Sequence, residues 1–235
     1  MFCCLRARLE THTGIIARIP RSGGEAVWQN ATVIEDTLPA RRPVGLAIFL
    51  VVAGVIGWIA SFVLTLEKIE TLINPNYVPS CNISVLVSCG PNMASPQGSL
   101  FGFPNPLIGV ASFVAVIVVG VGVLAGARFA RWFWVLFNLG IVAALVFVIW
   151  LIGQSVYVLG TLCPYCMVVW SVVIPLFWYV TVYNLREGNI PVPAGVRSIA
   201  GLFYPFLWLF VIVSYLVVAV LAQLRLDVIA SLTNS

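Results

Sequence analysis

The sequence has very little charge. Only 9% of its 235 residues are Asp, Glu, Lys or Arg, whereas 61% are hydrophobic. Soluble domains carry roughly 25% charged residues, so water cannot be the main solvent of this chain. The net charge of +4 is small and the arginines are scattered, which argues against nucleic-acid binding. The low charge and the high hydrophobic content favour a protein that is embedded in the lipid bilayer.

Long apolar runs take the place of the missing charge. A helix needs about 20 apolar residues to cross the hydrocarbon core of a bilayer. Five such runs follow Pro43 and use up most of the chain. They lie at about 45–66, 106–127, 132–152, 157–183 and 199–222. We therefore predict an all-α integral membrane protein with five transmembrane helices.

The basic residues are unevenly distributed. Residues 1–43 are polar, hold six of the twelve Lys and Arg residues, and lack the apolar part of a secretory signal peptide. We predict that they form a flexible cytoplasmic tail. With the N-terminus inside, ten Lys and Arg residues face the cytoplasm, and only Lys68 and Arg225 face outward. The long loop 67–105 and the connection near 153–160 are then extracytoplasmic.

Four of the six cysteines fall on that outer side. Cys81 and Cys89 lie in the long loop, and Cys163 and Cys166 form a C-x-x-C motif at the outer end of the fourth run. This is the oxidising side, where disulfides persist. The other two, at positions 3 and 4 of the tail, we expect to be incidental, because cytoplasmic thiols are kept reduced.

The C-x-x-C motif is suited to reversible redox chemistry. Residues i and i+3 of a helix share one face, so the two sulfurs can close a small ring and reopen it. The helix can begin at the motif, with Pro164 in its first turn and a thiolate favoured at its positive end. A kinked helix that enters earlier, with Pro164 inside it, is the alternative.

Structural interpretations of the cysteines stay open beside the redox one. Cys81 and Cys89 could simply staple the long loop. Cys163 and Cys166 could be half of a zinc site. The only histidine, His12, lies on the other side of the predicted membrane, and we expect no metal.

The order and spacing of these residues resemble the vitamin K epoxide reductase family, and specifically its bacterial members. A loop pair follows the first helix, and a C-x-x-C motif heads the fourth. Ser95 lies six residues after Cys89, where the family keeps a Ser or Thr. Asn105 matches the family's asparagine at the start of the second helix. The resemblance covers about 46–183.

The resemblance implies a four-helix bundle around a quinone over residues 44–184, with the outer loop as a lid. Residues 185–235 add a fifth transmembrane helix and a short extracytoplasmic C-terminus. In the family the cysteine at the Cys166 position faces the quinone, and its neighbour, here Cys163, exchanges disulfides with the loop pair. Residues at the positions of Ser95 and Asn105 donate hydrogen bonds to quinone oxygens.

One implied quinone contact departs from the family. Trp170 stands where vertebrate members have a tyrosine, and an indole N–H can donate a hydrogen bond but not accept one. That contact is therefore carried over only weakly. The resemblance to bacterial members favours menaquinone over ubiquinone.

Two details of the outer side follow from the residues themselves. The apolar stretch 98–103 is too short to span a membrane, and we expect it to rest at the surface over the quinone. Glu67, Lys68 and Glu70, at the outer end of the first run, we expect to form a solvated edge.

Our hypothesis is a quinone-dependent thiol–disulfide oxidoreductase that generates disulfides in a bacterial cell membrane. A reduced thioredoxin-fold partner attacks the Cys81–Cys89 disulfide, Cys89 attacks Cys163, and the freed Cys166 reduces the quinone. About a dozen residues follow residue 222. We therefore expect the partner to be a separate protein of the DsbA type.

Other functions use the same features differently. An enzyme whose main task is the reduction of vitamin K epoxide or quinone would use the same cysteines. A small transporter or a scaffold would use the disulfides only for stability. The near absence of ionisable residues in the runs argues against a transporter. A transporter or scaffold should also survive the loss of Cys166.

Overall fold

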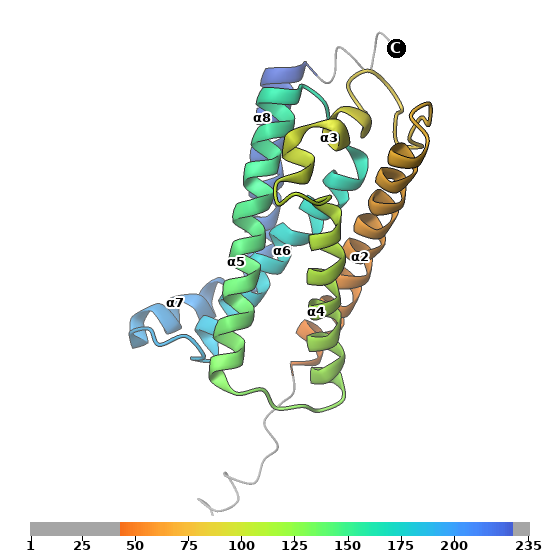
Figure 1. The fold of residues 1–235 in the computed structure, drawn as a ribbon. Coiled ribbons are helices and arrows are strands. Elements are labelled where there is room, and N and C mark those ends of the chain that lie inside the picture. Colours follow the sequence, from red (N-terminus) through yellow and green to blue (C-terminus); the bar gives the residue numbers. More distant parts are fainter. Residues whose placement is uncertain (1–42, 228–235) are drawn as a thin grey trace, which may run out of the picture. The chain divides into compact units, whose positions relative to one another are not determined.

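The computed structural model describes residues 43–227, which are mostly helical (Figure 1). Most of the predicted tail, with Cys3 and Cys4, lies outside the described residues. Five helical segments of the described part are long and apolar enough to cross a membrane. Their bounds are Val44–Ile73, Pro106–Leu124, Arg131–Leu159, Pro164–Arg186 and Ala194–Leu226. The predicted all-α membrane fold with five spans is confirmed.

The first four spans run up and down beside one another (Figure 1). They contain α2 (Val44–Ile73), α4 (Pro106–Leu124), α5 (Arg131–Gly153) and α6 (Pro164–Arg186). A π-helical segment, η2 (Gln154–Leu159), continues α5 to its outer end. Residues 157–159 of the predicted fourth run thus belong to the preceding element. Because α6 starts at Pro164 directly after Cys163, the helix that begins at the C-x-x-C motif is the correct alternative.

The packing of α2 against α4 depends on glycine. A β-carbon at Gly57 would lie 2.3 Å from Cζ of Phe113, and one at Gly109 would lie 2.4 Å from Oγ of Ser61. Helices in a membrane gain little from the hydrophobic effect on association, so close backbone approach supplies much of their attraction. These glycines therefore set the distance between the first two spans.

We expect Gly57→Ala to destabilise the protein by about 1–3 kcal/mol, because the new methyl group overlaps the Phe113 ring. Gly140→Ala is the matched control, since nothing lies within 4 Å of a β-carbon at that position of α5. Thermal unfolding in detergent compares the two variants. Equal unfolding temperatures would contradict the close packing of α2 on α4.

The fifth span is broken, which the continuous run predicted at 199–222 did not indicate. It consists of α7 (Ala194–Phe203), a 3₁₀ turn η3 (Tyr204–Phe206) and α8 (Leu207–Leu226). Pro205 lies at the break, where its missing N–H removes a helical hydrogen bond. In Figure 1, α7 projects sideways from the lower end of the bundle, whereas α8 lies along it.

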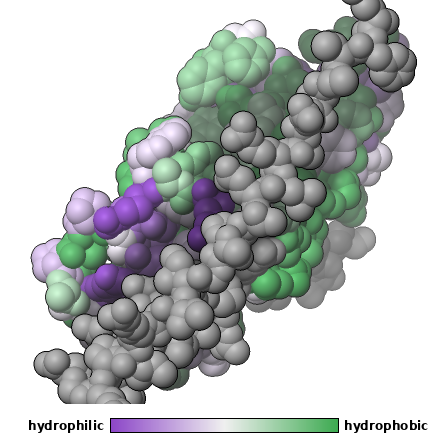
Figure 2. Space-filling model, turned by 90° about the horizontal axis from the view of Figure 1, so that it is seen from below, coloured by the Kyte–Doolittle hydropathy of each residue, from purple (hydrophilic) through white to green (hydrophobic). Residues whose placement is uncertain are grey.

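The charged side chains of the described part gather at the two ends of the spans. One end, viewed in Figure 2, carries a hydrophilic patch bordered by hydrophobic side chains. The charged residues at this end are Arg128, Arg131, Arg186, Glu187 and Arg197. The opposite end carries Glu67, Lys68, Glu70, Arg225 and Asp227. The excess of arginine at one end is what the predicted orientation requires, and the orientation itself stays a prediction.

Candidate functional site

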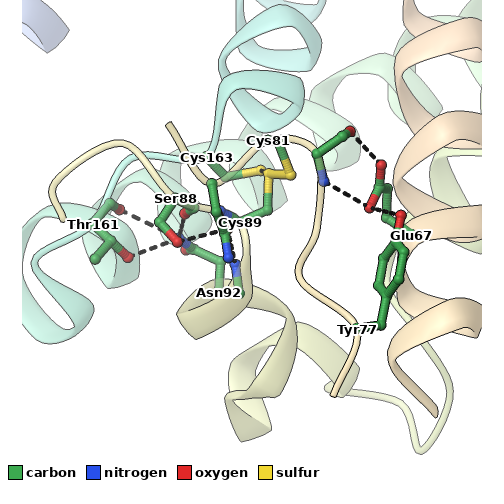
Figure 3. The surroundings of a disulfide bond; sticks show 11 residues. Glu67, Tyr77, Cys81, Ser88, Cys89, Asn92, Thr161 and Cys163 are labelled. Atoms are coloured by element: carbon green, nitrogen blue, oxygen red, sulfur yellow. Dashed lines mark hydrogen bonds between the residues drawn. A yellow bond between two sulfur atoms is a disulfide. The ribbon is translucent and has the colours of Figure 1, made fainter. Parts of the chain in front are cut away.

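The chain between α2 and α4 folds back over the end of the bundle at which α2 finishes and is held there by backbone hydrogen bonds. The Ser88 N–H donates to the Leu162 carbonyl at 3.0 Å, and the Leu162 N–H donates to the Leu86 carbonyl at 2.8 Å. This short parallel bridge joins Val87, two residues before Cys89, to Leu162, the residue before Cys163. The Cys81–Cys89 pair is therefore brought next to Cys163 of the C-x-x-C motif (Figure 3).

The four outer cysteines form a continuous chain of sulfurs. Cys81 and Cys89 are joined by a disulfide, whereas Cys163 and Cys166 are free thiols. The Sγ of Cys163 lies 3.1 Å from the Sγ of Cys89, and both residues are fully buried. Disulfide exchange requires a sulfur to approach a disulfide sulfur directly. A loop staple alone would not need this contact, so the geometry favours the redox interpretation.

The start of α6 favours ionisation of Cys163. The neighbouring Cys166 thiol lowers the pKa of Cys163 below its ordinary value. Burial acts in the opposite direction, and the backbone N–H groups of Cys166 and Tyr165 lower the pKa further. A lower pKa raises the fraction of thiolate at neutral pH, and the thiolate is the species that reacts in disulfide exchange.

Asn82 fixes the loop around Cys89. Its Oδ1 accepts hydrogen bonds from Oγ of Ser88 at 2.7 Å, the Cys89 N–H at 3.0 Å and the Gly90 N–H at 3.1 Å. These groups lie at the start of the short helix α3 (Gly90–Ala94). Asn82 thus accepts hydrogen bonds from backbone donors that a helix start leaves unpaired. Because Asn82 directly follows Cys81, these bonds also hold the two cysteines of the disulfide close to each other.

Asn92 fixes the same helix from the other side. Its Nδ2 donates to Oγ1 of Thr161 at 2.9 Å, and its Oδ1 accepts from Oγ of Ser155 at 2.9 Å. Thr161 lies two residues before Cys163, so Asn92 ties the helix after Cys89 to the segment that carries Cys163. Sequence analysis missed Asn92, whose only signal is its place one helical turn after Cys89.

We expect Asn92→Ala to slow disulfide exchange between Cys89 and Cys163 on the order of tenfold to a hundredfold, because it loosens the alignment of the two sulfurs. It should also cost about 1–3 kcal/mol of stability, since buried partners lose their hydrogen bonds. Asn92→Asp is the matched variant, because it keeps the acceptor for Ser155 and loses the donor to Thr161. Rapid-quench thiol labelling measures the exchange, and an unchanged rate in Asn92→Ala would contradict this role.

The expectation of a solvated edge at 67–70 is wrong for Glu67. Glu67 is only 7% exposed and accepts hydrogen bonds from the Tyr77 hydroxyl at 3.0 Å and from the N–H and hydroxyl of Ser80. The Lys68 ammonium donates to the Met93 carbonyl at 2.7 Å. The reason is that α2 continues to Ile73, so its last turns lie beneath the loop. Glu67 thereby anchors the residue before Cys81, and its carboxylate raises the pKa of Tyr77.

A cavity of about 530 Å³ opens beside the C-x-x-C motif. Its walls come from the spans and from the outer loop, and most of its lining residues are apolar. The lining also includes cysteines and small polar or amide side chains, namely Ser61, Asn92, Ser95, Gln97, Asn105, Ser112, Gln154, Ser155, Cys163 and Cys166. A cavity of this size, with a few polar groups, is typical of small-molecule sites.

All four residues predicted to contact a quinone line this cavity: Ser95, Asn105, Cys166 and Trp170. Phe101, from the predicted lid stretch, lines it as well, and its ring lies 6.2 Å from the ring of Phe147 in α5. The loop therefore forms one wall of the cavity. Within residues 43–227, no group of three or more His, Cys, Asp or Glu side chains is placed to hold a metal ion.

Ser95 and Asn105 also hold the loop itself. Nδ2 of Asn105 donates to the Gln97 carbonyl at 2.6 Å, and its Oδ1 accepts from the Leu100 N–H at 3.1 Å. The Ser95 hydroxyl donates to the Asn92 carbonyl at 2.9 Å. An asparagine amide has two N–H donors, so Asn105 retains one for a ligand, whereas Ser95 has to rotate its hydroxyl to donate to one.

A membrane bundle with two cysteine pairs in contact beside an apolar cavity is the arrangement of a membrane thiol–disulfide oxidoreductase. The chain belongs to the vitamin K epoxide reductase family, whose family model matches residues 48–181. The resemblance to this family seen in the sequence is thereby confirmed. Members of this family are oxidoreductases that act on disulfides with quinones and work with thioredoxin-like partners in a membrane. No curated protein matches the chain.

Proposed function

We propose that the protein generates disulfides by oxidising a separate, extracytoplasmic thioredoxin-fold protein of the DsbA type and passing the electrons to a membrane quinone. The 3.1 Å contact between the sulfurs of Cys89 and Cys163 is the observation that carries this proposal. It connects the disulfide of the loop with a dithiol beside the cavity.

The first step takes place at Cys81. Cys89 is engaged with Cys163, so Cys81 is the sulfur left for the partner. Cys81 is only 4% exposed, so the loop has to shift before a partner thiolate reaches it, and exposed apolar side chains of the same loop segment offer the partner a surface. Val78, Ile83 and Val85 are 71%, 74% and 96% exposed. A partner thiolate attacks Sγ of Cys81, the Cys81–Cys89 bond breaks, and Cys89 leaves as a thiolate. The partner's second thiol then displaces Cys81, which releases the partner with its own disulfide.

The second step passes the electrons inward. The Cys89 thiolate attacks Sγ of Cys163 in the Cys163–Cys166 disulfide, and Cys166 leaves as a thiolate. Cys81 then attacks Cys89, which restores the loop disulfide and frees Cys163. The product has a loop disulfide and a reduced C-x-x-C motif, the same redox state as in the structure.

The third step takes place at the cavity. When the Cys163–Cys166 disulfide forms again, two electrons and two protons leave the dithiol, and a bound quinone is their acceptor. The apolar walls suit a quinone ring, and Cys166 lies in the lining. Asn105, Ser95 and the Trp170 indole N–H are the donors available to its oxygens. We propose menaquinone rather than ubiquinone, following the resemblance to bacterial members.

The proposed site lies on the outer face of a bacterial cell membrane. With the N-terminus cytoplasmic, four of the six described basic residues lie inside, namely Arg128, Arg131, Arg186 and Arg197. The loop and the C-x-x-C motif then face the oxidising compartment.

The test is an assay of the purified protein in detergent with a reduced thioredoxin-fold oxidant and a quinone. We expect quinone absorbance to fall only when both the partner and the wild-type protein are present. Cys166→Ala should abolish the reaction, and Cys3→Ala/Cys4→Ala should leave it unchanged. Quinone reduction that persists in Cys166→Ala would contradict the proposed function.

A further inference from the structure

Three arginines converge on the turn that follows α6, at the end of the bundle far from the cysteines. The Arg131 guanidinium, from the first turn of α5, donates to the Gly188 carbonyl. Nε of Arg197, from α7, donates to the Arg186 carbonyl at 2.7 Å. The Arg186 guanidinium lies 5.0 Å from the centroid of the Tyr204 ring. One short turn thus gathers three positive charges from three elements.

Gly188 makes this convergence possible. Its φ of +70° is strained for any residue with a side chain, and a β-carbon there would lie 3.1 Å from Nη1 of Arg197. The Arg197 guanidinium therefore lies directly against Gly188, whose carbonyl accepts from Arg131. The positively charged guanidinium groups of Arg131 and Arg197 therefore both contact Gly188.

The described residues neutralise only part of this charge. The one carboxylate at this end is that of Glu187, whose Oε1 lies 4.0 Å from Nε of Arg186, with both side chains about half exposed. Arg131 and Arg197 bind neutral carbonyls, and each such bond uses one of the five N–H donors of a guanidinium. Donors therefore remain for an anion.

The neighbouring helix α7 adds an apolar surface. Val196, Ile199 and Phe203 recur at intervals of three and four residues, so they share one face, and they are 41%, 55% and 43% exposed. Helix α7 projects sideways from the bundle at the level where the spans end (Figure 1). A short helix with an exposed apolar face in this position is suited to lie in the membrane interface.

We propose that the corner formed by Arg131, Arg186 and Arg197 binds the phosphate headgroup of an anionic phospholipid, whose acyl chains lie against the apolar face of α7. Guanidinium groups bind phosphate through paired N–H donors. Basic pockets between transmembrane helices are suited to anionic headgroups. Inorganic phosphate would meet the same arginines but gain nothing from α7, so the site fits a lipid and not a free anion.

The test compares phosphatidylglycerol with phosphatidylcholine, using native mass spectrometry of the full chain to measure lipid affinity. We expect Arg131→Gln/Arg197→Gln to bind phosphatidylglycerol about thirtyfold more weakly than wild type, with phosphatidylcholine binding unchanged. The control is Arg128→Gln/Arg225→Gln, which removes two positive charges outside the corner and should keep the affinity.

Two further variants divide the site into its parts. Arg131→Lys/Arg197→Lys keeps the charge but loses the paired donors, so its affinity should lie between those of wild type and the glutamine variant. Ile199→Ser/Phe203→Ser should weaken lipid binding and leave inorganic phosphate binding unchanged. Equal losses in the two glutamine variants would overturn the site in favour of net charge alone. Inorganic phosphate binding as tightly as phosphatidylglycerol would show an adventitious ion only.

Discussion

Replacing both Cys81 and Cys166 by alanine is expected to leave a protein in which mild oxidation joins Cys89 to Cys163 almost completely. The two sulfurs are already 3.1 Å apart, and the residues that carry them are held by the bridge between Val87 and Leu162. With Cys81 and Cys166 both absent, the part of the chain that the structure describes holds no further thiol that could break the Cys89–Cys163 bond. The mixed disulfide, which is transient in the relay, therefore accumulates.

Diamide supplies the oxidant, and mass spectrometry of proteolytic peptides identifies the linkage. The matched control is Cys89→Ala/Cys166→Ala, which leaves Cys81 and Cys163 and should cross-link more slowly, because it lacks the sulfur in contact with Cys163. Cross-linking of both variants at one rate would mean that the contact has no special part in the transfer.

The second large effect is expected for Cys89→Ala. This variant has no loop disulfide for a reduced partner to attack, and no loop thiol in contact with Cys163. Partner-driven quinone reduction should therefore fall to the rate measured without protein. The cavity and the C-x-x-C motif remain intact, so quinone binding should persist, with quenching of tryptophan fluorescence as its measure, since Trp170 lines the cavity.

Comparison with Cys81→Ala separates the roles of the two loop cysteines. The Cys81→Ala variant also lacks the loop disulfide, but it keeps Cys89, whose sulfur contacts Cys163. We expect it to lose turnover with the partner as Cys89→Ala does, yet to retain one exchange in which reduced Cys89 opens the Cys163–Cys166 disulfide. Quenched-flow labelling of Cys166 detects that exchange. Labelling of Cys166 at the same rate in Cys89→Ala would contradict the order of transfer.

The spans and the reactive cysteines are predictable from the sequence, because both depend on local properties. Apolar runs longer than the bilayer core identify the helices, and the C-x-x-C motif with Pro164 identifies the start of α6. The break at Pro205 is less visible, because apolar residues continue on both sides of it. Hydropathy alone does not distinguish a helix that crosses the bilayer from a short helix at its end.

The polar contacts that align the sulfurs depend on pairings that no local pattern contains. Asn92 meets Thr161 and Ser155 across more than sixty residues of chain. Glu67 was expected to face water because it follows an apolar run, yet the returning loop buries it against Ser80. A charged residue near a span end has the same local sequence whether or not a loop covers it.

The most direct test of the relay is an anaerobic titration of the fully reduced protein with quinone, in a Cys3→Ala/Cys4→Ala background. Each disulfide that forms releases two electrons, which is what one quinone accepts. If both outer pairs are connected through Cys89 and Cys163, each protein should reduce two molecules of quinone, and Cys89→Ala should reduce one. If the wild-type protein and Cys89→Ala each reduced only one quinone per protein, the relay would be contradicted, because the loop pair would then pass no electrons to the cavity.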